Sequence, residues 1–302
     1  MVKLDKESLA KSIAAPGARL LESATYRDAP ELSYSGMRQL LENPYAYFHG
    51  ITKEATKSMD LGTAVHKLVL ESNWEEQKTN EGQHIAIMPK FGPQNVKANK
   101  EAKAHWMAAN VDSYIVDSEA YACAQAVVKS QYGSYFTSEN SICEVPIARS
   151  LTFENFDGEE VTMDFKMKAD CLVLENGAPH SIIDLKTASA SDESSFINSV
   201  AKGRYYLQAF IYKQVLGLEN FFFVCVENTY PYMIGVYSLD PAWDDLAKSD
   251  LAMVEYLLRN KERFVDNVRV MPYRSEEGQG LTICKCVRPP AWLLHKHENN
   301  IS

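Results

Sequence analysis

The sequence predicts one α/β or α+β domain, in which helices flank a central mixed sheet. Three observations lead to this class: apolar residues recur at helical spacing between residues 32 and 76, strand-like alternation begins at residue 141, and both patterns return after residue 203. Strands that alternate with helices are typical of a sheet covered by helices. The domain is expected to span residues 31–302, after an N-terminal segment over residues 1–30 that shows no clear preference for helix or strand. At 302 residues the chain can bury a sizeable core.

Helices are expected in the first part of the domain. Residues 32–50 predict a helix capped by Ser33 or Ser35, and Pro44 opens a second turn that is rich in aromatic residues. Residues 59–76 carry apolar residues at helical spacing, which predicts a buried helix.

A lysine-rich segment follows over residues 86–105. Two prolines and a glycine interrupt regular structure there, so we expect a loop that leads into a helix over roughly residues 100–131. A charge run of this kind is usually a solvated surface. We expect these lysines to contact phosphate only if a site that acts on phosphate groups lies elsewhere in the chain. The lysines are Lys90, Lys97, Lys100 and Lys103.

The central part of the chain reads as strands. Residues 141–148 are rich in strand-forming residues, and residues 161–174 alternate between an apolar face and a polar face that ends with Asp170. Turn residues follow, and residues 181–187 return as the next strand, so the two strands predict an antiparallel hairpin.

Helices and strands alternate beyond this hairpin. We expect a helix over residues 203–217 that Gly217 stops, two strands within residues 221–239, and a long helix within residues 241–264.

Composition restricts the classes of function. The net charge of -9 argues against a general nucleic-acid coat protein, but it allows an enzyme that grips DNA in a local basic groove. The six cysteines lack the spacing of a disulfide framework and no signal-peptide pattern is present, so we expect reduced thiols in the cytoplasm. Cys284 and Cys286 form a lone pair that could bind metal only with other ligands. No apolar run predicts a membrane span.

Charged residues interrupt the apolar strand at residues 181–187. Asp184 and Lys186 lie on one face of this strand, and the hairpin can bring Asp170 close to them. Two carboxylates would hold Mg²⁺, and an ammonium beside them would orient water or stabilise developing negative charge. Taken alone, the pattern favours a structural ion pair on a half-exposed sheet, because many proteins carry it by chance.

Several motifs in order resemble the PDDEXK nuclease superfamily, in the branch that contains the RecB nuclease domain, lambda exonuclease and the RecE-type exonuclease. Its core motif, an acid followed by acid-x-lysine, matches Asp170 and "DLK" at residues 184–186. "LSYSGMRQLLENPYAYF", "GTAVHKLVLE", "ICEVPI" and "YYLQAFIYKQVLG" are similar to other motifs of the branch. These pieces span residues 32–217, and the details are most like the RecE-type group.

The resemblance implies a restriction-endonuclease-like core and a role for each matching residue. Metal binding would involve two carboxylates and a backbone carbonyl, with a histidine and a further glutamate supporting them. A lysine would position the attacking water, and a glutamine and a tyrosine one helical turn apart would brace that lysine or touch a phosphate. The metal-site residues would be His66, Glu144, Asp170, Asp184 and Leu185, and the remaining catalytic residues would be Lys186, Gln208 and Tyr212.

The resemblance also implies an activity. The chain would be a Mg²⁺-dependent exodeoxyribonuclease, with Mn²⁺ as a substitute, that degrades linear double-stranded DNA from its ends with 5′-to-3′ polarity. A ring-shaped homo-oligomer and a single-strand annealing partner in phage-type recombination would accompany it, in a bacterial cytoplasm. The lysine-rich segment would line the DNA path, and enclosure by a ring would compensate for the acidic exterior.

Two alternatives stay open at this point. The first is another nuclease of the same fold, either an endonuclease or a single-strand-specific enzyme. The second is a catalytically idle DNA-binding or assembly protein.

Some superfamily members hold an iron–sulfur cluster with three cysteines near the C-terminus, but only Cys284 and Cys286 occur there, so no cluster is predicted.

Overall fold

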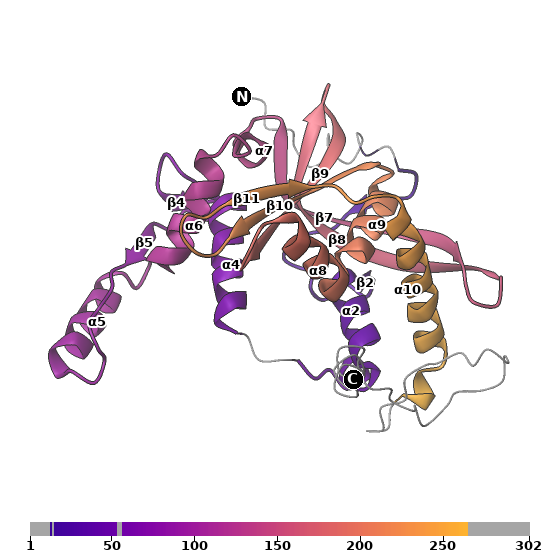
Figure 1. Cartoon of the computed structure of the whole chain (residues 1–302), viewed down its shortest axis with the longest axis horizontal. Helices are drawn as coiled ribbons and strands as arrows, with labels where there is room; N and C mark the ends of the chain where they lie inside the picture. The colour runs from indigo at the N-terminus through magenta and orange to yellow at the C-terminus, as the bar shows by residue number, and fades with distance from the viewer. Residues whose placement is uncertain (1–12, 14, 53–55, 265–302) are drawn as a thin grey trace, which may run out of the picture.

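A mixed sheet forms the centre of the computed structural model, which describes residues 13, 15–52 and 56–264 (Figure 1). The strand order is β1-β7-β8-β9-β10-β11, and β2 pairs with β8 beside this path. β9 and β10 are parallel, as are β2 and β8, whereas the other neighbours are antiparallel. The strands are β1 (Arg19–Leu20), β2 (Leu32–Ser33), β7 (Ser141–Glu154), β8 (Glu160–Glu175), β9 (Ala178–Ala188), β10 (Asn220–Glu227) and β11 (Ile234–Tyr237).

Helices cover both faces of this sheet, so the predicted class is correct. Alternate strand residues feed two hydrophobic clusters: Ile182 and Phe223 pack with one set of helices, whereas Ile183 and Val224 pack with the other. The first set is α2 (Tyr34–Glu42), α8 (Glu193–Gly203), α9 (Tyr205–Leu216) and α10 (Ala242–Arg259), and the second is α4 (Lys57–Leu70), α6 (Ser118–Lys129) and α7 (Ser134–Thr137).

Capping residues explain where several helices begin and end. Ser33 accepts a hydrogen bond from the Gly36 amide at 3.1 Å and starts α2, as predicted, and Pro44 is the first residue of α3 (Pro44–Phe48). Gly217, with φ of 67°, ends α9 as expected. The helix predicted over residues 59–76 instead runs from Lys57 to Leu70.

The basic segment differs from its prediction. It forms an arm of β5 (Ile85–Met88), α5 (Lys97–Ala109) and β6 (Tyr114–Asp117), which projects from the sheet in Figure 1, and two short strands, β3 (Ser72–Asn73) and β4 (Lys78–Thr79), precede it. The single helix expected over residues 100–131 is wrong, because β6 separates α5 from α6. The β-branched residues Ile115 and Val116 favour a strand, and Asp117 then caps α6 by accepting from the Ala120 amide at 2.7 Å.

A buried lysine fixes the N-terminal segment to the sheet. The Lys166 ammonium, on β8, donates to the backbone carbonyls of Tyr26, Arg27 and Ala29 at 2.9, 3.1 and 2.5 Å. These bonds satisfy a charge that burial would otherwise make costly. The described part of residues 1–30 therefore has little regular structure beyond β1, yet it is anchored on β8.

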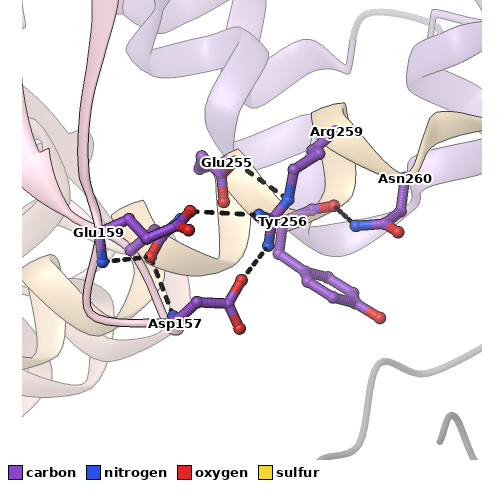
Figure 2. Close-up of polar contacts among 7 residues, drawn as sticks. Asp157, Glu159, Glu255, Tyr256, Arg259 and Asn260 are labelled. Carbon is purple, nitrogen blue, oxygen red and sulfur yellow. Dashed lines mark hydrogen bonds and ion pairs between the residues drawn. The ribbon is translucent and has the colours of Figure 1, made fainter.

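A cluster of charges joins the β7–β8 turn to the end of α10, as Figure 2 shows. The Arg259 guanidinium donates to Asp157 Oδ2 at 2.6 Å and lies 3.9 Å from Glu159 Oε2 and 3.3 Å from Glu255 Oε1. The two amides of Asp157 and Glu159 donate to the Asn155 side chain, which fixes the turn itself. We call this group the Arg259 clamp.

Candidate active site

The strands β8 and β9 separate at the point where the predicted site lies. Their pairing runs from Glu175 and Ala178 to Cys171 and Ile183, and it ends there. Asp170 and Asp184 are the next residues on the two strands. The Leu185 amide, which lies beyond the β8–β9 pairing, donates to Asp170 Oδ2 at 2.8 Å. One carboxylate thus replaces a strand partner, and both acids sit at the opening of the sheet.

Asp184 is held tightly at this opening. Its side chain is 1% exposed, Oδ1 accepts from Gln208 Nε2 at 2.6 Å, and Oδ2 pairs closely with the Lys186 ammonium. Burial raises the pKa of Asp184 to about 6, and the neighbouring Asp170 carboxylate contributes to the increase.

Lys186 remains a cation in these surroundings. Its Nζ lies 5.0 Å from the centre of the Tyr205 ring and 5.8 Å from that of Phe223, so aromatic faces support the charge. Burial by itself would lower the pKa of Lys186, but Asp184 and Asp170 together raise it above its ordinary value. The ammonium can therefore donate hydrogen bonds over the whole range of physiological pH.

Helix α4 brings His66 to the same place. Its Nδ1 lies 3.5 Å from Asp170 Oδ2, and burial, together with the charge of Lys186, lowers its pKa to about 4, so the imidazole is neutral. Gly62 lies one turn earlier, where an added Cβ would come within 3.0 Å of Thr187 Oγ1. The glycine therefore permits the close approach of α4 to β9 that carries His66 to the acids.

The partners of Gln208 and Tyr212 differ in part from the predicted ones. Both lie on α9 and both are buried, but Gln208 holds Asp184 rather than Lys186. The Tyr212 hydroxyl is 3.5 Å from the carbonyl of Lys168, which it can donate to only weakly. The residues thus brace the acid and the strand β8 rather than the lysine.

Glu144 lies beside this group on β7, with its backbone in the left-handed region at φ of 58°. Its carboxylate pairs closely with the Lys168 ammonium. Lys168 was not among the predicted site residues. A signal for it was present, because it precedes Asp170 by two positions on the polar face of the alternating strand.

The four predicted DNA-binding lysines lie apart from this cluster, on or near the projecting α5 (Figure 1). Lys90 lies 3.5 Å from the Glu119 carboxylate and Lys97 lies 3.7 Å from that of Glu101, which are long distances for ion pairs. No described residue of α5 is buried, so Lys100 and Lys103 also reach solvent. Their role in binding DNA stays a prediction.

The oxygen donors at the opening fit a hard divalent cation. Asp170 and Asp184 supply carboxylates on neighbouring strands, the oxygen donors that Mg²⁺ prefers, and the Leu185 carbonyl follows directly after Asp184 on β9. Over the described ranges, no three His, Cys, Asp or Glu side chains already converge to hold an ion. Asp184 already accepts from Gln208 through Oδ1 and pairs with Lys186 through Oδ2, so a metal ion would bind the acceptor positions that these partners leave free.

Other predictions fall outside this geometry. Cys284 and Cys286 lie beyond the described residues, so the predicted lack of an iron–sulfur cluster stays a prediction. Among the helices that are described, none is long and apolar enough to cross a bilayer.

Comparison with known families identifies the fold. Residues 33–282 match the model of a family described as a PDDEXK-like domain of unknown function. The chain belongs to this PDDEXK-like family. Its mixed sheet with helices on both faces is consistent with a PDDEXK nuclease fold, and the opening between β8 and β9 carries the acid and acid-x-lysine residues after which such domains are named.

Solved structures resemble this PDDEXK-like chain more distantly. A "putative exonuclease" from Eubacterium rectale is 19% identical, with a TM-score of 0.46, and the match covers 82% of this chain and 86% of that one. SSO0001 is 16% identical over 72% and 84% of the two chains, with a TM-score of 0.27. Rai1 from Scheffersomyces stipitis is 10% identical over 79% and 64%, with a TM-score of 0.30. No curated protein matches the sequence significantly. The family assignment therefore rests on the family model.

Proposed function

We propose that this PDDEXK-like chain is a Mg²⁺-dependent nuclease that hydrolyses phosphodiester bonds from the ends of linear double-stranded DNA. The observation that carries the proposal is the meeting of Asp170, Asp184 and Lys186 where β8 and β9 separate. A buried structural ion pair needs only one acid and one lysine. This opening also holds a second carboxylate, Asp170, with His66 beside it, and Gln208 as a further donor to Asp184.

Each residue has a defined task in this proposal. Asp170, Asp184 and the Leu185 carbonyl would hold Mg²⁺, or Mn²⁺ in its place, with neutral His66 supporting Asp170. A bound divalent cation neutralises phosphate charge and makes water more acidic. Lys186 then donates a hydrogen bond to the attacking water or to a phosphate oxygen that gains negative charge.

The surrounding residues keep this arrangement in place. Gln208 fixes one oxygen of Asp184, and Tyr212 supports β8 through the Lys168 carbonyl. The buried α9 that carries both residues excludes solvent from one side of the carboxylate. A carboxylate with few orientations loses less freedom when it binds a cation, which favours binding.

The finer features of the proposal come from the resemblance to RecE-type exonucleases. They are 5′-to-3′ polarity, a homo-oligomeric ring around DNA, a single-strand annealing partner in phage-type recombination, and action in a bacterial cytoplasm. Glu144 would supply a further metal or water contact, once it leaves Lys168.

The deciding experiment compares linear and covalently closed circular duplex DNA, each with Mg²⁺ or with EDTA. We expect loss of the linear DNA alone, and only with Mg²⁺. Cutting of the circle would replace the proposal with an endonuclease, and preference for single strands would replace it with a single-strand-specific enzyme. No cutting, together with no heat of Mg²⁺ binding in calorimetry, would identify an idle DNA-binding protein.

Metal affinity is expected to depend on pH through Asp184. Because the pKa of this carboxyl is about 6, a proton occupies it at lower pH and competes with Mg²⁺. Affinity should fall about tenfold per pH unit below 6 and level off above it. Calorimetry at pH 5.5 in buffers with different ionisation enthalpies should show proton release on binding, and equal affinities at pH 5.5 and pH 7.5 would contradict the prediction.

Reversing the charge of Lys97, Lys100 and Lys103 to glutamate tests the arm. If the arm follows the DNA backbone, duplex binding should weaken and the salt slope should fall by up to about 3, near 0.9 for each lost phosphate contact. Fluorescence anisotropy with a labelled duplex over a series of salt concentrations measures both. Lys129→Glu on α6 serves as a control. An unchanged salt slope in the triple variant would show that the arm does not contact DNA.

A further inference from the structure

A second pair of lysine and acid borders the proposed site. Lys168 lies on β8, two residues before Asp170, and its ammonium pairs with the Glu144 carboxylate across the β7–β8 ladder. Regular pairing holds on either side, between Cys143 and Cys171 and between Val145 and Ala169, but the position in between is interrupted. The ion pair thus sits at a break in the ladder, level with a proposed metal ligand.

The two members of this pair are not equally accessible. The Lys168 side chain is 39% exposed and that of Glu144 is 17% exposed, so the lysine is the member that a ligand from solvent can reach. Glu144 also holds a left-handed backbone, which is uncommon for a residue with a side chain inside a strand. Such conformations persist where the surroundings enforce them, and they gather at functional sites.

Lys168 belongs electrostatically to the site. Its charge acts on both Asp170 and His66, which places it within range of the groups that would surround the scissile phosphate. Its backbone carbonyl is next to the Tyr212 hydroxyl, so α9 supports the strand at this residue. A second cation near Lys186 would suit a substrate with more than one phosphate.

We propose that Lys168 binds a phosphate of the DNA substrate, and that Glu144 is its partner only while the site lacks DNA. The inference rests on the proposed function, since it takes DNA as the ligand. A phosphate carries a full negative charge and several acceptor oxygens, and it reaches the exposed lysine from solvent. Glu144 therefore competes with the substrate for one ammonium, and binding of DNA releases this carboxylate next to Asp170.

Competition predicts effects of opposite sign for the two members of the pair. Lys168→Met should weaken binding of a linear duplex about five- to tenfold at 0.1 M salt and lower the salt slope by about 1. Glu144→Gln should tighten binding about two- to fivefold, because the half-exposed Lys168 ammonium then has no charged partner to give up. The double variant should bind like Lys168→Met, and Lys168→Arg should keep the affinity of the wild type.

Fluorescence anisotropy of a labelled duplex in EDTA measures these affinities without cleavage. Asp245→Asn and Lys248→Met provide a matched control, because this pair on α10 is also an ion pair at 3.1 Å, exposed and of the same chemistry. Each control substitution should change the affinity for DNA only by the small effect of losing or gaining one net charge. Thermal melting of all variants establishes that the chains are folded.

The outcomes separate this inference from the proposed function. Opposite shifts for Lys168→Met and Glu144→Gln support it. If both variants bind DNA more weakly and also melt at a lower temperature, the pair has a structural role. If neither affinity changes, Lys168 does not bind DNA. In both cases, a wild type that still degrades linear DNA leaves the nuclease proposal standing. A wild type that neither binds nor cuts DNA would overturn both.

Discussion

Replacing Lys186 by alanine is expected to slow cleavage of linear duplex DNA by at least about a hundredfold, the usual cost of removing a donor aimed at developing charge. The variant loses the ammonium beside Asp184. It also loses the attraction that holds the pKa of Asp184 down, so this pKa rises above its present value of about 6 and the carboxyl binds Mg²⁺ less well. The rate should be measured under single-turnover conditions at saturating Mg²⁺.

Two further variants separate charge from geometry at this position. Lys186→Arg keeps a cation but spreads it over a planar group, so it should restore Mg²⁺ affinity more than cleavage. Lys248→Ala removes an exposed lysine of α10 and should cleave at the rate of the wild type. If Lys186→Ala kept more than a tenth of the wild-type rate, Asp184 and Lys186 would be interpreted as a structural ion pair rather than as catalytic residues.

The largest loss of stability is expected for Phe223→Ala, at about 3–5 kcal/mol in the free energy of unfolding. Phe223 is fully buried on β10, and its ring lies 4.8 Å from that of Phe221, 5.5 Å from Phe196 and 5.8 Å from Tyr205. Truncation leaves a cavity that these rigid rings cannot fill. Urea unfolding followed by tryptophan fluorescence measures the change.

The same substitution also removes an aromatic face beneath Lys186. Cleavage by the folded fraction should therefore fall as well, because the ammonium loses a neighbour that restricts it. Val224→Ala is the matched control: it is equally buried, one residue along the same strand, but it faces the α4 and α6 side. It should lower stability and leave cleavage per folded molecule unchanged. A loss below about 1 kcal/mol for Phe223→Ala would show that the core refills the space.

The sequence pattern was sufficient for the hairpin that carries the acids. Alternation with a period of two put Asp170 and Asp184 on neighbouring strands, and a chain reversal between them brought them together. The point at which β8 and β9 separate could not be predicted, because it depends on packing and on the Asp170 carboxylate that takes the Leu185 amide.

Long-range contacts account for most of what the sequence did not reveal. Lys166 was expected on a polar face, yet it is buried under carbonyls almost 140 positions earlier in the chain. The pairing of Glu144 with Lys168 likewise needs the register of β7 against β8, which no local pattern specifies. The parallel pairing of β5 with β6 was missed because four-residue strands are too short to display a period.

The Arg259 clamp has a consequence for how the chain is made. Arg259 meets Asp157 across 102 positions, so β7 and β8 leave the ribosome well before the helix that fastens their turn. During that interval the surfaces of α2 and α9 against which α10 packs are open to other chains. A nascent chain that stops before α10 should consequently depend on chaperones and aggregate when they are absent, even though every proposed catalytic residue has already been synthesised.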